Sequence, residues 1–389
     1  MDYLKKKAII LYWLIKMNKS QLKTPCYIIQ KEKLIHNLEI LSYVKKQTGC
    51  KILLAQKCFS MYSLYPLIGE YVDGCTASGL FEAKLGREEM NKENHVFSPA
   101  YRQDEIEEII DLCDEIVFNS FKQLRKYQAQ VKAKGKGIGI RINPEISTQV
   151  GHEIYDPCAP GSRLGTTLAQ FDETLLENVD GLHFHTLCEQ NSDDLKTTLK
   201  VVEEKFGQYM HQMKWINFGG GHHITREDYD LDLLIECIKH VQDTYHVQVY
   251  IEPGEAFVLN AGTLLTTVLE TNYNGMNLAI VDTSAACHMP DVLEMPYRPP
   301  LKKSGNPSEK AYTYRLGGPT CLSGDIIGDY SFDEPLKEGD QLEFEDMALY
   351  TMVKTNMFNG MNLPDIVVEE KGNYEVYKTF GYQDFKSRL

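Results

Sequence analysis

Eight short runs of β-type residues, separated by segments with helical spacing, constrain the fold of this 389-residue chain more than any other feature. The runs cover residues 52–55, 72–76, 95–98, 115–119, 137–143, 181–186, 215–218 and 247–252. Strands that alternate with helices favour a parallel sheet, and eight such units predict an α/β fold with a closed (β/α)₈ TIM barrel. In such barrels the functional side chains gather where the strands end.

Several chemically active residues stand close to these predicted strand ends, namely Lys57, Asp73, Arg141, His185, Gly219, Gly220, Gly221 and Glu252. Lys57 is the leading catalytic candidate, because it follows the apolar run at residues 52–55 at the expected mouth of the barrel. Burial beside Ala55, Cys58 and Phe59 would lower the pKa of its amine and make it nucleophilic.

The pattern of the chain changes after Gly254. Short β-type runs separated by turn residues then follow, at residues 264–270, 277–282, 312–316, 341–345 and 374–379. We therefore expect an N-terminal extension over residues 1–23, a barrel over residues 31–256 and an all-β domain over residues 257–389. The apolar β-like segment at residues 24–30 precedes the helical spacing of residues 31–46 and belongs outside the barrel. Residues 290–310, rich in proline and charge, are expected to form a loop.

Charge and cysteine usage narrow the class of protein. With 41 basic and 55 acidic residues the formal net charge is 41 − 55 = −14, which argues against nucleic acid and anionic membranes as partners. Ten cysteines are scattered without a CxxC pair, so we expect no disulfide framework or zinc ribbon, and a reducing cytoplasm as the location. The apolar run at residues 8–15 is far shorter than the roughly 20 residues of a membrane span, and no cleavage site follows it.

The glycine run at residues 219–221 follows the seventh predicted strand, where barrels frequently bind phosphate through backbone N–H groups. A phosphate at this position, opposite Lys57, suggests pyridoxal 5'-phosphate as the cofactor. Glu252 closes the eighth strand. A carboxylate beside the pyridine nitrogen would keep this nitrogen protonated and favour carbanion chemistry such as decarboxylation.

Two interpretations of the histidines remain open. His183 and His185 alternate along the sixth predicted strand, so both could face the barrel interior. They could form a metal pair like those of metal-dependent barrel hydrolases, extended by His222 and His223, or one ring could stack on a flat cofactor. Cys321, in the glycine- and proline-containing loop at residues 318–325, could likewise be a proton donor or only a surface thiol.

The ordered motifs, taken together, run from about residue 24 to near the C-terminus. They comprise Lys57, Asp73 with Ala77-Ser78 and Glu82, Arg141-Ile142-Asn143, the strand-six histidine, FGGG, EPG, GPTCLSGD, and Tyr350 followed by Phe358-Asn359-Gly360. This set resembles the fold-type III pyridoxal-phosphate decarboxylases, which include the ornithine, arginine, diaminopimelate and carboxynorspermidine decarboxylases. The resemblance implies an alanine racemase-like barrel, a β domain completed by residues 24–30, and a homodimer with shared active sites.

The resemblance also implies roles for individual residues. Lys57 would link covalently to the cofactor, His185 would stack on its ring, and Glu252 would contact the pyridine nitrogen. The phosphate would be held by Gly219, Gly220, Gly221, Gly254 and Tyr350, with supporting roles for Asp73 and Arg141. Cys321 and Asp325 would come from the partner subunit, with Cys321 protonating the carbanion after carbon dioxide leaves.

Two departures from the family pattern concern charge. In the ornithine and diaminopimelate branches EPG is followed by arginine, whereas this chain has Glu255, and residues 186–189 replace a small polar motif with a segment that ends in Glu189. The missing arginine removes a phosphate ligand, whereas the added carboxylates suit a substrate with extra ammonium groups. With Ser162-Arg163-Leu164-Gly165, these departures most resemble the carboxynorspermidine/carboxyspermidine decarboxylases of polyamine and spermidine biosynthesis.

The resemblance therefore implies a lyase that acts on a small cationic carboxylated polyamine and needs no metal. Acidic residues would hold the amine groups of the substrate, and the candidates are Glu189, Glu255, Glu294 and Asp325. Diaminopimelate or arginine decarboxylation is the alternative within the same fold, and alanine racemisation is disfavoured because Glu252 makes the cofactor a strong electron sink. A catalytically silent regulator and a metal-dependent hydrolase are the alternatives from other classes.

Overall fold

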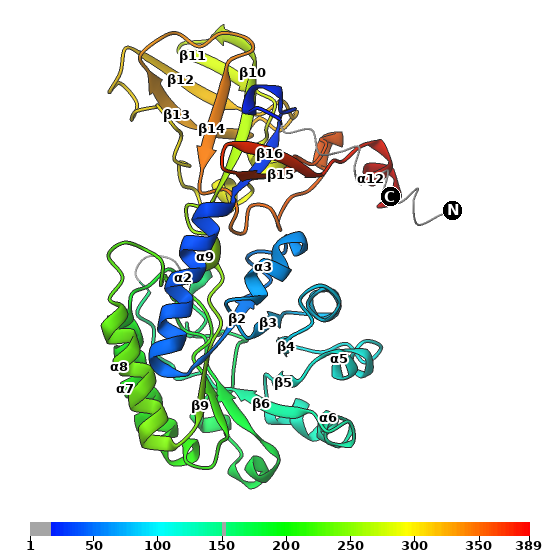
Figure 1. Cartoon of the computed structure of the whole chain (residues 1–389), viewed down its shortest axis with the longest axis vertical. Coiled ribbons are helices and arrows are strands. Elements are labelled where there is room, and N and C mark those ends of the chain that lie inside the picture. The colour runs from blue at the N-terminus through cyan, green and yellow to red at the C-terminus, as the bar shows by residue number, and fades with distance from the viewer. Residues whose placement is uncertain (1–16, 150–152) are drawn as a thin grey trace. The chain divides into compact units, whose positions relative to one another are not determined.

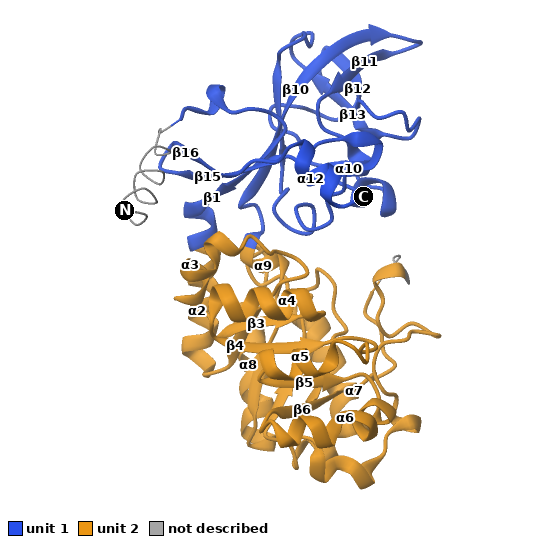
Figure 2. Cartoon of the chain, turned by 90° about the vertical axis from the view of Figure 1, so that its right-hand side faces the viewer, with its two compact units in different colours: residues 1–35, 258–389 blue, residues 36–257 orange. Residues whose placement is uncertain are grey.

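The computed structural model describes residues 17–149 and 153–389. Part of the predicted extension, residues 1–16, lies outside the described residues. The chain forms two compact units (Figure 2), of which unit 1 contains the described residues up to Ile35 together with Val258–Leu389, and unit 2 contains His36–Phe257. No helix of the described residues is both long and apolar enough to cross a lipid bilayer.

Unit 2 is a closed barrel of eight parallel strands (Figure 1), which confirms the predicted fold class. Each strand pairs with the next along the chain, and the first pairs with the last. The strands are β2 (Lys51–Ala55), β3 (Gly74–Ala77), β4 (Glu93–Phe97), β5 (Glu115–Phe118), β6 (Gly137–Arg141), β7 (Gly181–His183), β8 (Trp215–Asn217) and β9 (Gln248–Ile251).

Helices alternate with most of these strands, as the sequence spacing predicts, whereas short 3₁₀ helices lie between β6 and β7 in the described residues. The α-helices are α2 (Lys31–Thr48), α3 (Tyr65–Gly69), α4 (Leu80–Leu85), α5 (Ile106–Leu112), α6 (Phe121–Ala133), α7 (Ser192–Met210), α8 (Leu231–Tyr245) and α9 (Glu255–Val258). Local chemistry sets their ends: the side chain of Asp230 accepts a hydrogen bond from the Leu233 amide at the start of α8, and His246, at φ 56°, ends that helix in the left-handed conformation.

Large and very small residues fit together inside the barrel. Trp215 on β8 is buried with Leu53, Val117 and Tyr250. The indole lies against two glycines of neighbouring strands, because a Cβ atom added to Gly181 would lie 2.0 Å from the Trp215 ring. A Cβ atom on Gly139 would lie 2.5 Å from the same ring. The barrel interior is thus a packed core, and only its mouth is available for a ligand.

Unit 1 is built on a mixed sheet with the strand order β13-β12-β11-β10-β1-β15-β16, and β14 pairs with β10. The strands are β1 (Cys26–Gln30), β10 (Gly262–Tyr273), β11 (Asn277–Val281), β12 (Tyr312–Gly317), β13 (Ile326–Phe332), β14 (Gln341–Glu345), β15 (Asp365–Glu370) and β16 (Asn373–Lys378). The first strand of the chain lies inside this sheet, antiparallel to β10 and parallel to β15, as the family resemblance implies.

The structure corrects three details of the predicted second domain. Residues 17–23 are not a separate extension, because Met17 pairs with Tyr374 on β16 and Leu22 packs against Ile28. The domain is not purely β, since it also contains α10 (Ala285–His288), α11 (Asp291–Glu294) and α12 (Tyr382–Ser387). The strands β13 and β15 were not predicted, because glycine, acidic residues and an adjacent proline obscure their alternation.

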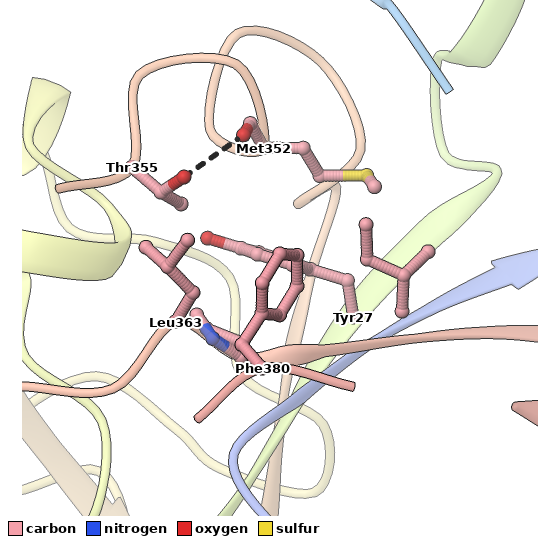
Figure 3. Close-up of a pocket in the computed structure, with 7 residues that line it drawn as sticks. Tyr27, Met352, Thr355, Leu363 and Phe380 are labelled. Atoms are coloured by element: carbon pink, nitrogen blue, oxygen red, sulfur yellow. Dashed lines mark hydrogen bonds between the residues drawn. The ribbon is translucent and has the colours of Figure 1, made fainter. Parts of the chain in front are cut away.

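A small cavity in unit 1 is too small for a substrate. It encloses about 40 Å³ and is lined by Tyr27, Met352, Thr355, Leu363, Pro364, Ile366 and Phe380 (Figure 3). The Tyr27 hydroxyl donates a hydrogen bond to the carbonyl oxygen of His288, and Thr355 donates to Met352. Ligand pockets usually measure about 300–1,000 Å³. This cavity is therefore not a candidate for the active site.

The packing of Trp215 generates a test of the barrel core. Gly181→Ala should lower the free energy of unfolding by about 1–3 kcal/mol, because the new methyl group overlaps the indole. Urea unfolding followed by tryptophan fluorescence measures this change. Gly381→Ala is the matched control, since a Cβ atom there meets nothing within 4 Å. Equal stability of the two variants would contradict the packing described.

Candidate active site

The barrel brings five of the predicted site positions to one end. Because the strands are parallel, their carboxyl ends share one mouth. Arg141 is the last residue of β6, Glu252 directly follows β9, and His185 stands two residues after β7. Lys57 stands two residues after β2, and the glycine run at residues 219–221 likewise begins two residues after β8. These positions stand at the ends of five different strands, so only barrel closure unites them.

Glu252 has the most firmly held side chain in the mouth. Its exposed fraction is 7%. Asn217 Nδ2 donates a hydrogen bond to Glu252 Oε1 at 2.8 Å, and His183 Nε2 lies 3.3 Å from Glu252 Oε2. Both carboxylate oxygens are therefore oriented by donors on neighbouring strands. This arrangement fixes the direction in which the carboxylate can meet a ligand.

Electrostatics keeps Glu252 ionised. Burial alone would raise the pKa of this carboxyl, but His183, His95 and the Asn217 amide outweigh it and hold the pKa near about 2. Burial lowers the pKa of His183 below its ordinary value, while the charge of Glu252 acts in the opposite direction. A proton on His183 Nε2 would make the contact with the ionised carboxylate a charge-assisted hydrogen bond.

His185 presents a ring that is only half-buried. Its Nδ1 accepts a hydrogen bond from the Gly220 amide at 2.9 Å, and its carbonyl oxygen accepts one from Arg141 at 3.1 Å. The pKa of His185 lies well below its usual value because of burial and the nearby charges of Lys57 and Arg141. A neutral ring held by its edge, with part of its surface accessible, can stack on a flat ligand.

Lys57 reaches the open mouth, where solvent contacts its side chain. Protein nevertheless surrounds it on most sides, and this desolvation is the first cause that lowers its pKa. The positive charge of Arg141 lowers the pKa further. The sequence-based expectation of a lowered pKa is confirmed in direction. An amine that loses its proton more readily is a better nucleophile.

The three glycines adopt a tight loop that no other residues could form. Gly219 and Gly221 have φ values of 69° and 82°, a region that favours glycine. A Cβ atom on Gly221 would lie 1.9 Å from the Leu187 carbonyl oxygen. The Gly219 amide donates to Asn217 Oδ1 at 2.8 Å and the Gly220 amide donates to His185. Within the described residues only the Gly221 amide of this loop is left without a protein acceptor.

Asp73 does not lie at the mouth, and its predicted position there is wrong. It immediately precedes β3, so it lies at the amino end of that strand. Its carboxylate accepts a hydrogen bond from the Ile52 amide at 2.9 Å and pairs with Lys45 at 2.8 Å. Asp73 therefore ties two strands and a helix together at the closed end of the barrel.

The histidine metal pair is also contradicted. His183 is engaged with Glu252, and His185 is held through the Gly220 amide, so their ring nitrogens do not converge on one point. Among the described residues, the group whose ligand atoms do converge consists of Glu189, His223 and Glu255. It does not contain the alternating histidines.

In unit 1, Cys321 is exposed on the loop between β12 and β13. The Cys321 amide donates to Asn359 Oδ1 at 2.6 Å. Asp325 is buried, and its carboxylate accepts hydrogen bonds from Thr320 and Ser284 at 2.6 and 3.0 Å. These contacts tie Asp325 to Thr320 in the Cys321 loop and to Ser284 before α10, and the role of Asp325 toward the substrate stays a prediction.

Two further predicted residues of unit 1 have local partners. Glu294 ends α11 and pairs with Lys354 at 3.1 Å. Tyr350 has a φ of 47°, in the left-handed region. The roles of Glu294 toward the substrate and of Tyr350 toward a phosphate stay predictions. Sequence reasoning missed Asn217, whose position at the end of β8 beside the glycine run was the available signal.

Comparison with known proteins identifies the class. The family model described as pyridoxal-dependent decarboxylase, C-terminal sheet domain, matches residues 26–348. The chain therefore belongs to the pyridoxal-dependent decarboxylases.

Particular relatives narrow the class. Carboxynorspermidine/carboxyspermidine decarboxylase of Campylobacter jejuni is 43% identical over 95% of this chain and 99% of its own length. Carboxyaminopropylagmatine decarboxylase of Synechocystis is 41% identical over 95% of this chain and 96% of its own length. The crystal structure of Campylobacter jejuni carboxynorspermidine decarboxylase with norspermidine matches with a TM-score of 0.89 and 42% identity, covering 95% of this chain and 100% of that one. Diaminopimelate decarboxylase of Deinococcus radiodurans is only 27% identical, over 52% of this chain.

The buried neutral histidines predict the pH dependence of stability. Burial lowers the pKa of His222 and of His288 to about 4, and it lowers that of His183 and His185 as well. Because the unfolded chain binds these protons near pH 6.5, stability is present above that pH and is lost as the pH falls toward about 4. Burial of Glu115 raises its pKa to about 7 and acts in the opposite direction. The net effect from pH 7.5 to 5.5 is a loss, at about 1.4 kcal/mol per histidine.

Urea unfolding at the two pH values measures this loss. His222→Gln should reduce the pH dependence by roughly one histidine's share, about 1.4 kcal/mol. His240→Gln is the control, because His240 is half-exposed and pairs with Glu203. Identical pH slopes for both variants and the parent chain would show that His222 is not buried in its neutral form.

Proposed function

We propose that this chain is a pyridoxal 5'-phosphate-dependent decarboxylase of carboxylated polyamines, with carboxynorspermidine and carboxyspermidine as substrates. The observation that carries the proposal is the barrel mouth, where a lysine of lowered pKa and an anchored, ionised carboxylate stand together. The similarity to a carboxynorspermidine/carboxyspermidine decarboxylase over nearly the whole chain supports the choice of substrate.

The residues of the mouth fit the cofactor that the family implies. When bound, pyridoxal phosphate withdraws electrons from the α-carbon of an amino acid, so that carbon dioxide can leave. Lys57 supplies the amine that can link to an aldehyde. Glu252, held by Asn217 and His183, supplies the negative charge that keeps a proton on a pyridine nitrogen. His185 supplies a neutral ring face, and the unused Gly221 amide supplies a donor for a phosphate oxygen.

The remaining predicted cofactor contacts concern Arg141, Gly254 and Tyr350. Burial lowers the pKa of Arg141 to about 10, still well above neutrality, so its guanidinium stays positive beside His185. A Cβ atom on Gly254 would lie 2.6 Å from Cys58 Cβ, so only glycine allows this approach of the strand-nine loop to the Lys57 segment. Tyr350 belongs to unit 1, and its phosphate contact stays a proposal.

Cys321 is the proposed proton donor, supplied by a second copy of the chain. Its loop is held rigidly by Asp325 and Asn359 while the thiol is exposed. Three apolar residues in or near this loop have exposed fractions of 37–50%. Leu322 lies in the loop, Ile326 directly follows it, and Phe358 precedes its partner Asn359. Exposed apolar groups beside a rigid reactive loop support the proposal of a homodimer with shared active sites.

A second substrate has specific support. The carboxyaminopropylagmatine decarboxylase relative covers the chain as fully as the carboxynorspermidine relative and is nearly as identical. Agmatine ends in a guanidinium group, whereas norspermidine ends in an ammonium group. The two candidates share the reacting end and differ at the far end. Diaminopimelate is a weaker candidate substrate, because the Deinococcus radiodurans diaminopimelate decarboxylase resembles this chain only distantly.

Carbon dioxide release tests the function. The purified protein with pyridoxal phosphate should decarboxylate carboxynorspermidine and carboxyspermidine, whereas diaminopimelate and arginine should react at least about tenfold more slowly, because these substrates lack the polyamine tail. Carbon dioxide release from carboxyaminopropylagmatine is measured in parallel. Faster release from this compound would make it the preferred substrate. Lys57→Ala should lose the visible absorption band of the lysine-linked cofactor and nearly all turnover. Full turnover by this variant would refute the proposal.

Mixing inactive variants tests the shared site. Lys57→Ala and Cys321→Ala homodimers should each be nearly inactive. After exchange of subunits, half of the dimers are mixed and each holds one intact site, so about a quarter of the parent activity should return. Cys321→Ala should retain the cofactor band. No recovery on mixing, despite demonstrated subunit exchange, would place each active site within one chain.

A further inference from the structure

Three side chains from separate segments converge beside the glycine loop. Glu189 follows β7, His223 follows the glycine loop, and Glu255 is the first residue of α9. One ligand atom of each lies within 4.8 Å of the other two. His223 Nε2 lies 3.0 Å from Glu255 Oε2. We call these residues the mouth cluster. All three belong to unit 2, so their arrangement is set by the barrel alone.

His223 is the member of the mouth cluster whose environment indicates a ligand. Its exposed fraction is 8%. Within the described residues neither ring nitrogen makes a hydrogen bond, because the approach to Glu255 lacks hydrogen-bond alignment. A buried polar group without a partner costs about 1–3 kcal/mol. The ring nevertheless points at Glu255, so the group that would satisfy it belongs inside the cluster.

Charge indicates the kind of ligand. Two carboxylates within 4.8 Å of each other repel, and partial burial strengthens that repulsion. Their field is visible on Cys188: burial, followed by the charges of Glu255 and Glu189, raises the pKa of its thiol to about 12. The charge of Lys57 acts on the same thiol in the opposite sense. The cluster is therefore a negative site within electrostatic reach of the reactive lysine.

A positive ligand would also relieve a conflict with the cofactor. Gly221, whose amide we propose as a phosphate donor, packs against Leu187 and Cys188 in the segment that leads to Glu189. A phosphate there would be repelled by the carboxylates unless a cation lay between them. A cation bound beside Glu255 would offset this repulsion.

We propose that Glu189, His223 and Glu255 form a subsite for a protonated amine of the substrate. This inference rests on the proposed function and names the residues that would recognise the polyamine. Two oxygens that each lie about 2.8 Å from a tetrahedral ammonium nitrogen are about 4.6 Å apart, a separation that the 4.8 Å bound on the cluster permits. Neighbouring ligands of a divalent ion at about 2.1 Å are about 3.0 Å apart, which is the separation of His223 Nε2 and Glu255 Oε2, so a metal titration is needed to separate the two ligands.

Binding of norspermidine, a polyamine without a carboxylate, tests the subsite without any turnover. Calorimetric titration of the full-length protein carrying pyridoxal phosphate should give a dissociation constant that rises about tenfold or more in Glu255→Gln and in Glu189→Gln, because each loses a charge-assisted hydrogen bond. Glu204→Gln, on the exposed face of α7, removes the same charge elsewhere and should leave the constant unchanged. Retention of the cofactor band shows that each variant is folded.

The outcomes separate the subsite from the proposed function. If the parent protein releases carbon dioxide from carboxylated polyamines but the Glu255 and Glu189 variants bind norspermidine as tightly as the Glu204 control, the subsite is refuted and the function stands. If the parent protein releases none, the function fails whatever the titration shows. Glu189 is exposed, so Glu189→Gln keeps the test decisive even if Glu255→Gln fails to fold.

A metal titration tests whether the mouth cluster binds a divalent metal ion instead of an amine. The chelator-treated protein is titrated with Mn²⁺ and with Zn²⁺, with and without norspermidine. Weak binding that the polyamine displaces supports the amine subsite. Stoichiometric, tight metal binding that Glu255→Gln abolishes and that norspermidine does not displace would overturn it and assign the mouth cluster to a metal.

Discussion

The anchored carboxylate of Glu252 is the interaction on which the rest of the site depends. An isolated buried carboxylate would take up a proton, because burial disfavours its charge. Here Asn217 and His183 donate to its two oxygens, and its pKa falls to about 2 instead. The charge can be buried only because β7, β8 and β9 are adjacent in the closed barrel. The ionised state of Glu252 therefore depends on the closed barrel, which brings its two hydrogen-bond donors together.

The same donors organise the glycine loop. Asn217 binds Glu252 through its amide nitrogen and the Gly219 amide through its oxygen, so one side chain links the strand-nine carboxylate to the strand-eight loop. The Gly220 amide then sets the edge of the His185 ring. Two of the three glycine amides therefore position protein groups, and the third has no protein acceptor within the described part of the chain. The glycine run is thus a scaffold for neighbouring side chains.

The mouth is polarised by charge. Lys57 and Arg141 lie on one part of it, and each lowers the pKa of neighbouring basic groups. Glu189 and Glu255 bring negative charge close to the glycine loop, beside His223. A substrate that carries a carboxylate at one end and protonated amines along its length matches a site with both signs. The charges of the mouth are therefore consistent with the similarity to decarboxylases of carboxylated polyamines over nearly the whole chain.

The sequence by itself determined the barrel, all eight of its strands, and the residue types at the mouth, because periodicity and strand-end position are local properties. Local patterns also placed Lys57, Arg141, His185, the glycine run and Glu252 correctly at the strand ends. Asp73 was wrongly assigned to the mouth, although residues 72–76 already placed it near the amino end of the predicted strand, and its contacts with Lys45 and Ile52 show that it faces the closed end.

The tertiary structure alone decided which groups act on one another. The partners of Glu252 stand on separate strands, 35 and 69 residues away in sequence. The contacts of Asp325 with Ser284 and Thr320 are not visible in its motif. The convergence of Glu189, His223 and Glu255 is likewise invisible in the sequence. Hydrogen bonds and electrostatic fields depend on distances in space, and barrel closure sets these distances between segments whose local patterns are independent.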